Sequence, residues 1–143
     1  MLVHGQPMQR PSKFHKEERA FSGPGAEQRG ADQRVAELIV TACVMSAFGV
    51  TQEDIDHPSR GPARTALARQ VSMYLHHVVL ERTLTSVAQA FGRDRTTVAH
   101  ACRVIEDRRD DPEFDAMLSA LEEAIASGLR LMRPCPVRAG GRV

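Results

Sequence analysis

The chain has 143 residues, of which 42% are apolar and 26% are charged, so it is about the length of one small domain and too short for most multidomain enzymes. Its 19 lysines and arginines nearly balance its 18 acidic residues, and the formal net charge of +1 identifies neither a nucleic-acid-binding nor an acidic protein. The charge is unevenly placed, however. Residues 60–103 are net positive, whereas residues 31–59 and 104–127 are net negative.

The cysteines and the amino terminus indicate a cytoplasmic protein. Cys43, Cys102 and Cys135 are odd in number and show no C-x-x-C spacing, so neither a disulfide framework nor a zinc site is expected. Residues 1–7 lack the layout of a signal peptide, and the apolar stretch 38–50 is too short to span a bilayer. We therefore expect no membrane partner, no metal and no cofactor.

Both ends of the chain have the composition of tails. Residues 1–30 are rich in glycine, proline, glutamine and basic residues, and we predict a flexible basic tail because they bury too little apolar surface to fold. Residues 128–143 contain further prolines, glycines and arginines, and we predict a second, Arg-rich tail. The folded domain is then residues 31–127.

Between the tails the hydrophobic residues recur with a helical period, and no segment alternates convincingly with the period of a strand. The sequence therefore predicts an all-α fold, a small helical bundle. The first helix ends near Phe48 and is followed by a short helix over 52–56, with Thr51 as its cap. The first helix is predicted to bury a stripe formed by Val35, Leu38, Ile39 and Ala42.

Two further helices lie on either side of the basic segment. The longest is predicted over 63–81, and a final helix begins at Pro112 with Asp111 as its cap. The buried face of the longest helix is predicted to hold Leu67, Val71, Tyr74, Leu75 and Val78. That of the final helix is predicted to hold Phe114, Met117, Leu118, Leu121 and Ile125.

The segment 84–103 has the spacing of a helix-turn-helix. Ala88 is the small residue where two helices cross, Gly92 makes the turn, and Val98 is the branched residue beneath the second helix. Thr83 or Thr85 is the expected cap of the first helix and Asp94 that of the second. The stripe that the second helix buries is predicted to be Val98, Ala101, Cys102 and Ile105.

The outward face of that second helix favours DNA over plain solvent. Arg95, Thr96, His100 and Arg103 share this face, and Arg93 flanks it. These side chains are able to contact base edges and phosphates, whereas a merely solvated helix usually includes glutamate and lysine.

These residues match a known family. The run from Ala90 to Glu106, AFGRDRTTVAHACRVIE, resembles the signature of the C-terminal DNA-binding domain of the bacterial replication initiator DnaA. Residues 68–75, ARQVSMYL, and 47–55, AFGVTQEDI, resemble two other segments of that domain, and together the likeness covers roughly residues 33–126. The resemblance implies a six-helix domain with a recognition helix in the major groove and a basic loop in the adjacent minor groove.

The resemblance also implies DNA-contacting residues. The expected base or neighbouring phosphate contacts are Asp94, Arg95, Thr96, Thr97 and His100. The expected phosphate contacts are Arg69, Gln70, Thr83 and Thr85. The basic loop contributes Arg60 and Arg64, although these lie one position away from the usual basic sites of the family, which Gly61 and Ala63 occupy here.

Two more departures affect the signature itself. The family usually has two glycines before its Arg-Asp pair and this chain has only Gly92, so the turn is one residue shorter. The usual histidine after that pair is replaced by Arg95. A different base preference is therefore compatible with the resemblance.

The leading hypothesis is a sequence-specific binder of double-stranded DNA, similar to small DnaA-related proteins that keep only this domain. The phosphate loop G-x-x-x-x-G-K-[ST] does not occur, so we expect no ATPase activity. The alternative is a protein-interaction module that docks on the replication initiator or its regulators, motivated by the altered basic loop and by the acidic residues between Glu106 and Glu123. An enzyme is not expected, because adjacent His76 and His77 diverge by about 100° on a helix, and no small-molecule substrate is expected. The resemblance implies a monomer.

Overall fold

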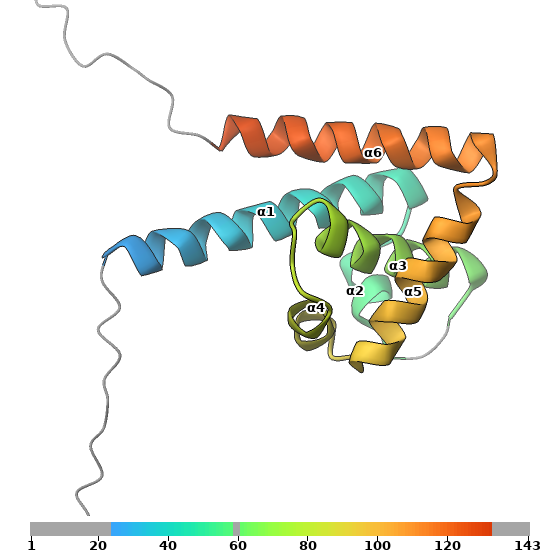
Figure 1. The fold of residues 1–143 in the computed structure, drawn as a ribbon, viewed down its shortest axis with the longest axis horizontal. Coiled ribbons are helices and arrows are strands. Elements are labelled where there is room, and N and C mark those ends of the chain that lie inside the picture. Colours follow the sequence, from blue (N-terminus) through green and yellow to red (C-terminus); the bar gives the residue numbers. More distant parts are fainter. Residues whose placement is uncertain (1–23, 59–60, 133–143) are drawn as a thin grey trace, which may run out of the picture.

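The computed structural model describes residues 24–58 and 61–132, and within these ranges it contains six helices and no strand (Figure 1). This confirms the predicted all-α fold class. None of the described helices is both long enough and apolar enough to cross a membrane. The helices are α1 (Pro24–Phe48), α2 (Gln52–Asp56), α3 (Ala63–Val78), α4 (Leu84–Phe91), α5 (Arg95–Arg108) and α6 (Pro112–Leu131).

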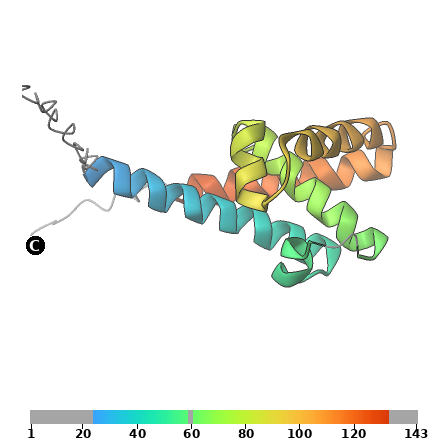
Figure 2. The ribbon, with the colours of Figure 1, turned by 90° about the horizontal axis from the view of Figure 1, so that it is seen from below.

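Helix α3 is the centre of the bundle. It packs against α1, α2, α4 and α5, while α6 lies along α1 in the opposite direction (Figures 1 and 2). The inner faces of these helices exclude water almost completely, which supplies the main favourable term for folding. Fully buried side chains of this core include Val40, Val44, Val71, Leu75, Val98, Ile105, Leu118 and Ile125.

The predicted helix starts at 51 and 111 are confirmed. Thr51 and Asp54 form a capping box, in which Thr51 Oγ1 accepts from the Asp54 N–H at 3.2 Å and the Asp54 carboxylate accepts from the Thr51 N–H at 2.8 Å. These bonds from Thr51 lower the pKa of Asp54. Asp111 accepts from the Glu113 N–H at 3.0 Å, and Pro112 takes the first helical position.

The helix lengths differ from the prediction. Helix α1 begins at Pro24 and α6 continues to Leu131, so residues 24–30 and 128–131 are helical rather than parts of tails. Side-chain bonds four residues apart, from Gln28 to Asp32 at 3.0 Å and from Gln33 to Glu37 at 3.2 Å, support the early start of α1. The rest of the two predicted tails lies outside the described residues.

The longest helix is α1, with 25 residues, and not α3, with 16. Helix α3 stops at Val78 because the chain turns at Glu81, whose φ of 53° is left-handed and incompatible with a continuing helix. Val78 itself is 43% exposed, contrary to the prediction that it is buried. The remainder of the predicted stripe of α3 is buried or half-buried.

The predicted buried stripe of α1 is wrong at most of its positions, although Ile39 does pack against the core. The residues that face α3 and α6 are centred on Val40, Val44 and Phe48, whereas Val35 is 44% exposed and Leu38 is 65% exposed. Helix α1 carries apolar residues on both sides, so a helical period fits two stripes equally well. Its neighbours in the bundle decide which stripe is buried.

Candidate DNA-binding surface

Helices α4 and α5 form the predicted helix-turn-helix. Thr83 caps α4, since its hydroxyl accepts from the Ser86 N–H at 3.1 Å. Gly92 ends α4 with a left-handed φ of 58°, which glycine adopts without strain. Beneath the turn, Ala88 is 5% exposed and Val98 is fully buried. The roles predicted for these three spaced residues are confirmed.

The outward face of α5 is also as predicted. Its buried stripe is Val98, Ala101, Cys102 and Ile105. The side chains on the opposite side, at the start of the helix and along its first turns, are exposed: Asp94, Arg95, Thr96, Thr97, His100 and Arg103. Asp94 takes the N-cap position but accepts no capping hydrogen bond, contrary to the prediction that it caps the helix. Its carboxylate is therefore available for another donor.

Arg93 is half-buried and bonded within the protein. Its Nη2 donates to the His57 carbonyl at 2.9 Å and its Nη1 to the Pro58 carbonyl at 3.2 Å. The turn of the helix-turn-helix is thereby tied to the chain that leaves α2. Arg93 is thus bonded within the protein, and its predicted DNA contact stays a prediction.

Arg69 is a second arginine that is bonded within the protein near the end of α2. It is only 7% exposed, and it donates from Nε to the Ile55 carbonyl at 2.8 Å and from Nη2 to the Asp54 carbonyl at 2.9 Å. Burial lowers the pKa of Arg69, and the nearby charge of Arg93 lowers it further. The predicted phosphate contact is not supported, because the guanidinium is occupied by the end of α2, where the helix dipole favours a cation.

The other predicted contacts are spread around α5. Arg64, Thr83 and Thr85 are exposed, and Gln70 is half-buried. Arg60 lies outside the described residues. Of the predicted set, the structure brings the residues of α5 together on one exposed face, and it shows Arg69 and Arg93 bonded to carbonyls within the protein.

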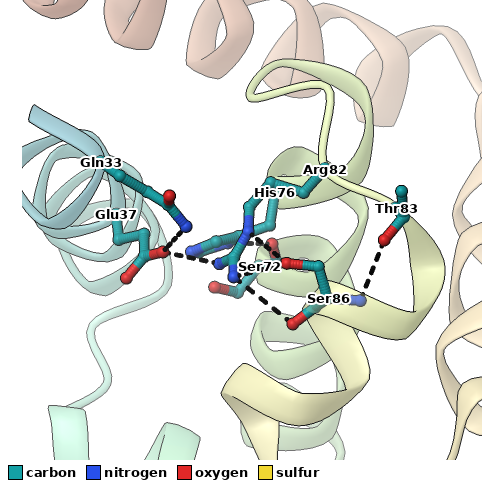
Figure 3. A network of polar contacts seen from close by, with 7 residues as sticks. All are labelled: Gln33, Glu37, Ser72, His76, Arg82, Thr83 and Ser86. Atoms are coloured by element: carbon teal, nitrogen blue, oxygen red, sulfur yellow. Dashed lines mark hydrogen bonds and ion pairs between the residues drawn. The ribbon is translucent and has the colours of Figure 1, made fainter. Parts of the chain in front are cut away.

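A polar network that the sequence analysis missed joins α1 to α4 (Figure 3). Arg82 Nη1 lies 2.7 Å from Glu37 Oε1, and Arg82 Nη2 donates to Ser86 Oγ at 2.8 Å. The Arg82 side chain is 12% exposed and that of Glu37 is 30% exposed, so water screens this pair only in part. No local pattern reveals the pair, because its members are far apart in the sequence.

His76 lies in the same network and is 3% exposed. Its Nδ1 is 2.8 Å from the Ser72 carbonyl, which only accepts, so Nδ1 carries the proton. The centroid of the Phe91 ring lies 5.1 Å from that of the imidazole, and the two rings are nearly perpendicular. Burial lowers the pKa of His76, so the ring is neutral at pH 7.

Arg109 joins the other end of α5 to α6 and α3. Its guanidinium lies 2.6 Å from Asp115 and 2.8 Å from Glu122, and it donates to the Tyr74 hydroxyl at 3.1 Å. The bonds to Glu122, Tyr74 and Asp115 raise the pKa of Arg109. Part of the acidic segment is thus used inside the fold.

Metal-binding chemistry has no visible support in the described part of the chain. No group of three or more histidine, cysteine or acidic side chains there is placed to hold a metal ion. Cys102 is buried, which raises the pKa of its thiol, and Cys43 is half-buried. Cys135 lies outside the described residues.

Comparisons with known proteins decide the kind of domain. Residues 37–105 match the family model described as the bacterial DnaA protein helix-turn-helix. These residues form a DnaA-type DNA-binding domain. The match extends from the second half of α1 to the buried residue Ile105 of α5, so it includes the exposed residues between Asp94 and Arg103.

Individual DnaA proteins are similar over the same region. The chromosomal replication initiator protein DnaA of Bifidobacterium animalis subsp. lactis is 39% identical over 83 residues, which are 57% of this chain and 14% of that protein. DnaA of Bordetella pertussis is 41% identical over 71 residues, which are 48% of this chain and 15% of that protein. The chain thus spans less than a fifth of the length of these two initiators.

Solved DnaA structures share the fold. AMPPCP-bound DnaA from Aquifex aeolicus superposes with a TM-score of 0.61 at 31% identity, over 72% of this chain and 31% of that one. A replication initiator DnaA bound to AMPPCP and single-stranded DNA gives a TM-score of 0.64 at 30% identity, over 77% of this chain and 34% of that one. The sequence and fold comparisons therefore agree on a DnaA-type domain.

Proposed function

We propose that the protein binds double-stranded DNA sequence-specifically, with the start of α5 in the major groove, at sites like the box that DnaA recognises. The observation that carries this proposal is the exposed polar face of α5 within a DnaA-type helix-turn-helix. An α-helix fits the major groove, where each base pair presents a distinct set of donors, acceptors and methyl groups.

Each exposed residue at the start of α5 has a chemical role in this proposal. Arg95 donates in a fork to a guanine, and Asp94, which makes no capping bond, accepts from a cytosine amino group. The methyl groups of Thr96 and Thr97 meet thymine methyl groups. His100 contacts a base or a neighbouring phosphate.

The surrounding residues hold the backbone of the DNA. Phosphate contacts set the register of a protein on DNA without reading its sequence. In this proposal they come from Arg64, Gln70, Thr83, Thr85 and Arg103. Arg60 belongs to the same proposal through its place in the basic loop, and Arg69 and Arg93 act indirectly by fixing the end of α2.

In the cell, we propose, occupation of such sites regulates replication initiation or transcription without nucleotide hydrolysis by this chain. The names of the similar proteins support the link to replication. The place of action is then the bacterial nucleoid in the cytoplasm, and the partner is DNA rather than a small-molecule substrate.

Substitutions on α5 test this function. Arg95→Ala and Thr97→Ala should each weaken binding to a duplex carrying a DnaA box by about tenfold to a hundredfold, with a smaller effect on a scrambled duplex. Arg130→Ala removes an exposed arginine from α6 and should bind nearly as the wild type does. Fluorescence anisotropy of labelled duplexes measures all three, and unchanged affinity of both α5 variants would refute the assignment.

Docking on the replication initiator or its regulators is the alternative function. Part of its motivation, the acidic segment, is weakened because Asp115 and Glu122 are paired with Arg109. Capture of purified DnaA in the absence of DNA, undiminished by Arg95→Ala, would favour this alternative.

A further inference from the structure

Helix α1 has an apolar side that the fold leaves in water. Val40 and Val44 turn inward, and on the opposite side lies a row formed by Ala31, Val35, Leu38 and Ala42. Met45, the next position at this spacing, packs against the core. Within this row Leu38 is 65% exposed and Val35 is 44% exposed. Helix α1 packs mainly against α3 and α6. Leu38 borders a surface hollow together with Ile55 of α2 and Phe91 of α4.

The spacing of this row is that of a helix–helix seam. Its members follow one another by alternating steps of four and three residues, which is the a/d pattern of a coiled coil. A helix that is merely solvated has no reason to keep this repeat on its outer side. Leu38, Ala42 and Met45 also line a surface hollow with Val50 and Gln52, which leaves room for side chains of a second helix.

We propose that the row on α1 is a dimerisation seam, paired antiparallel with the same row of a second copy of this chain. A two-fold dimer requires a self-complementary patch. In the best register Val35 packs on Leu38 of the second copy and Ala31 packs on Ala42 of the second copy, so large residues meet large ones and small ones meet small ones. Arg34, beside the seam, then faces an uncharged residue, Thr41.

Charge disfavours the competing arrangements. A shift by one heptad toward the amino ends of the antiparallel pair places Arg34 opposite Arg34 of the second copy, and Asp32 opposite its own counterpart. The opposite shift makes a seam residue of Met45, which packs against the core. A parallel pair places Glu27 opposite Asp32 of the second copy. Like charges in these flanking positions destabilise a coiled coil, so the antiparallel register centred between Val35 and Leu38 is selected.

The seam is separate from the proposed DNA-binding face. Helix α5 packs on α3 and α4, whereas the seam belongs to α1, which packs mainly on α3 and α6. Dimerisation would therefore place two recognition helices in one particle without blocking either. This departs from the monomer that the family resemblance implies.

Sedimentation velocity on the full chain without DNA tests the seam. Because the seam is smaller than a standard interface, we expect a dimer with a dissociation constant of about 100 µM or tighter. Leu38→Glu should weaken self-association by about tenfold or more. Val78→Glu is the matched control, since Val78 is 43% exposed but lies on α3, and it should dimerise as the wild type does.

A wild type that stays monomeric up to about 500 µM, well above that expected constant, would overturn the proposal. So would a Leu38→Glu variant that dimerises normally. Circular dichroism confirms that each variant folds. Affinity for a single-box duplex should be the same for Leu38→Glu and wild type, so failure of DNA binding and failure of dimerisation are separate results.

Mixing two variants tests the register. Val35→Glu and Leu38→Lys should each be monomeric alone. In the antiparallel register the new glutamate of one copy faces the new lysine of the other, so an equimolar mixture should recover a heterodimer. A parallel pair places positions 35 and 38 in different layers of the seam, so the two new charges would not meet. Absence of recovery in the mixture would therefore contradict the antiparallel arrangement.

Discussion

Arg93 and Arg95 are two residues apart, yet their side chains have different surroundings. Arg93 is bonded to the carbonyls of His57 and Pro58, whereas Arg95 is exposed on α5. A bonded arginine stabilises the fold, and an exposed one is available to DNA. The two kinds of role are distinguishable by measuring stability and DNA affinity on the same variants.

Arg93→Ala should lower the free energy of unfolding by about 1–2 kcal/mol, because two hydrogen bonds to carbonyls are lost. Arg95→Ala should leave the free energy of unfolding unchanged within about 0.5 kcal/mol. Urea unfolding followed by circular dichroism measures both. Unchanged stability of Arg93→Ala together with weaker DNA binding would restore Arg93 as a direct DNA contact.

His76 should make the fold sensitive to mild acid. Burial holds its pKa below the ordinary value of 6.5, so the unfolded chain takes up a proton at a pH where the folded chain does not. The free energy of unfolding should therefore fall as the pH drops below 6.5. His76→Asn, which keeps a donor near the Ser72 carbonyl, should show a shallower fall between pH 6.5 and 5 in urea titrations. Equal slopes would contradict this account.

At the scale of the elements, the turn between α4 and α5 depends on its glycine. Gly92 has a φ of 58°, and a Cβ added there would meet no atom within 4 Å, so conformation and not space requires glycine. Gly92→Ala should destabilise the protein by about 1 kcal/mol. Gly25→Ala, in the exposed start of α1, should be neutral or stabilising in the same thermal or urea unfolding series. Equal effects of the two substitutions would refute the role of the turn.

Sequence reasoning succeeded mainly where the signal is local, with the exception of the cap predicted at Asp94, which accepts no capping hydrogen bond. The caps at Thr51 and Asp111 and the pattern of Ala88, Gly92 and Val98 depend on neighbours a few residues away, and all of these are confirmed. The buried face of α1 was mistaken because it is chosen by α3 and α6, which are distant in the chain.

The internal bonds of Arg69 and Arg93 were not foreseen for the same reason. Arg69 and Arg93 bind carbonyls that are 14 to 36 residues away, and backbone carbonyls leave no mark in a sequence. An arginine bonded to the end of a helix and an arginine bonded to phosphate look alike until the fold is known.

At the scale of the whole molecule, a few polar links hold the outer helices to the centre. Glu37 and Arg82 join α1 to the start of α4, and Arg109 joins α5 to α6 and α3. These links fix the two outer helices relative to the helix-turn-helix, which lets the exposed face of α5 act as a rigid surface.

Arg109→Met should therefore lower the free energy of unfolding by about 1–3 kcal/mol, because it leaves Glu122 and Asp115 without their cation. Arg108→Met is the control, since Arg108 is exposed and its guanidinium carbon lies over the face of Phe114, 5.9 Å from the ring centroid. Calorimetry at neutral pH compares the two. A larger loss for Arg108→Met would contradict this role for Arg109.

The measurement that tests the central claim most directly is the anisotropy of the purified chain on a labelled duplex with a DnaA box, against a scrambled duplex, at two salt concentrations. The account predicts a specificity ratio of about 10³ or more and affinity that falls as salt rises. A ratio near one would contradict sequence-specific binding by α5, whatever the affinity.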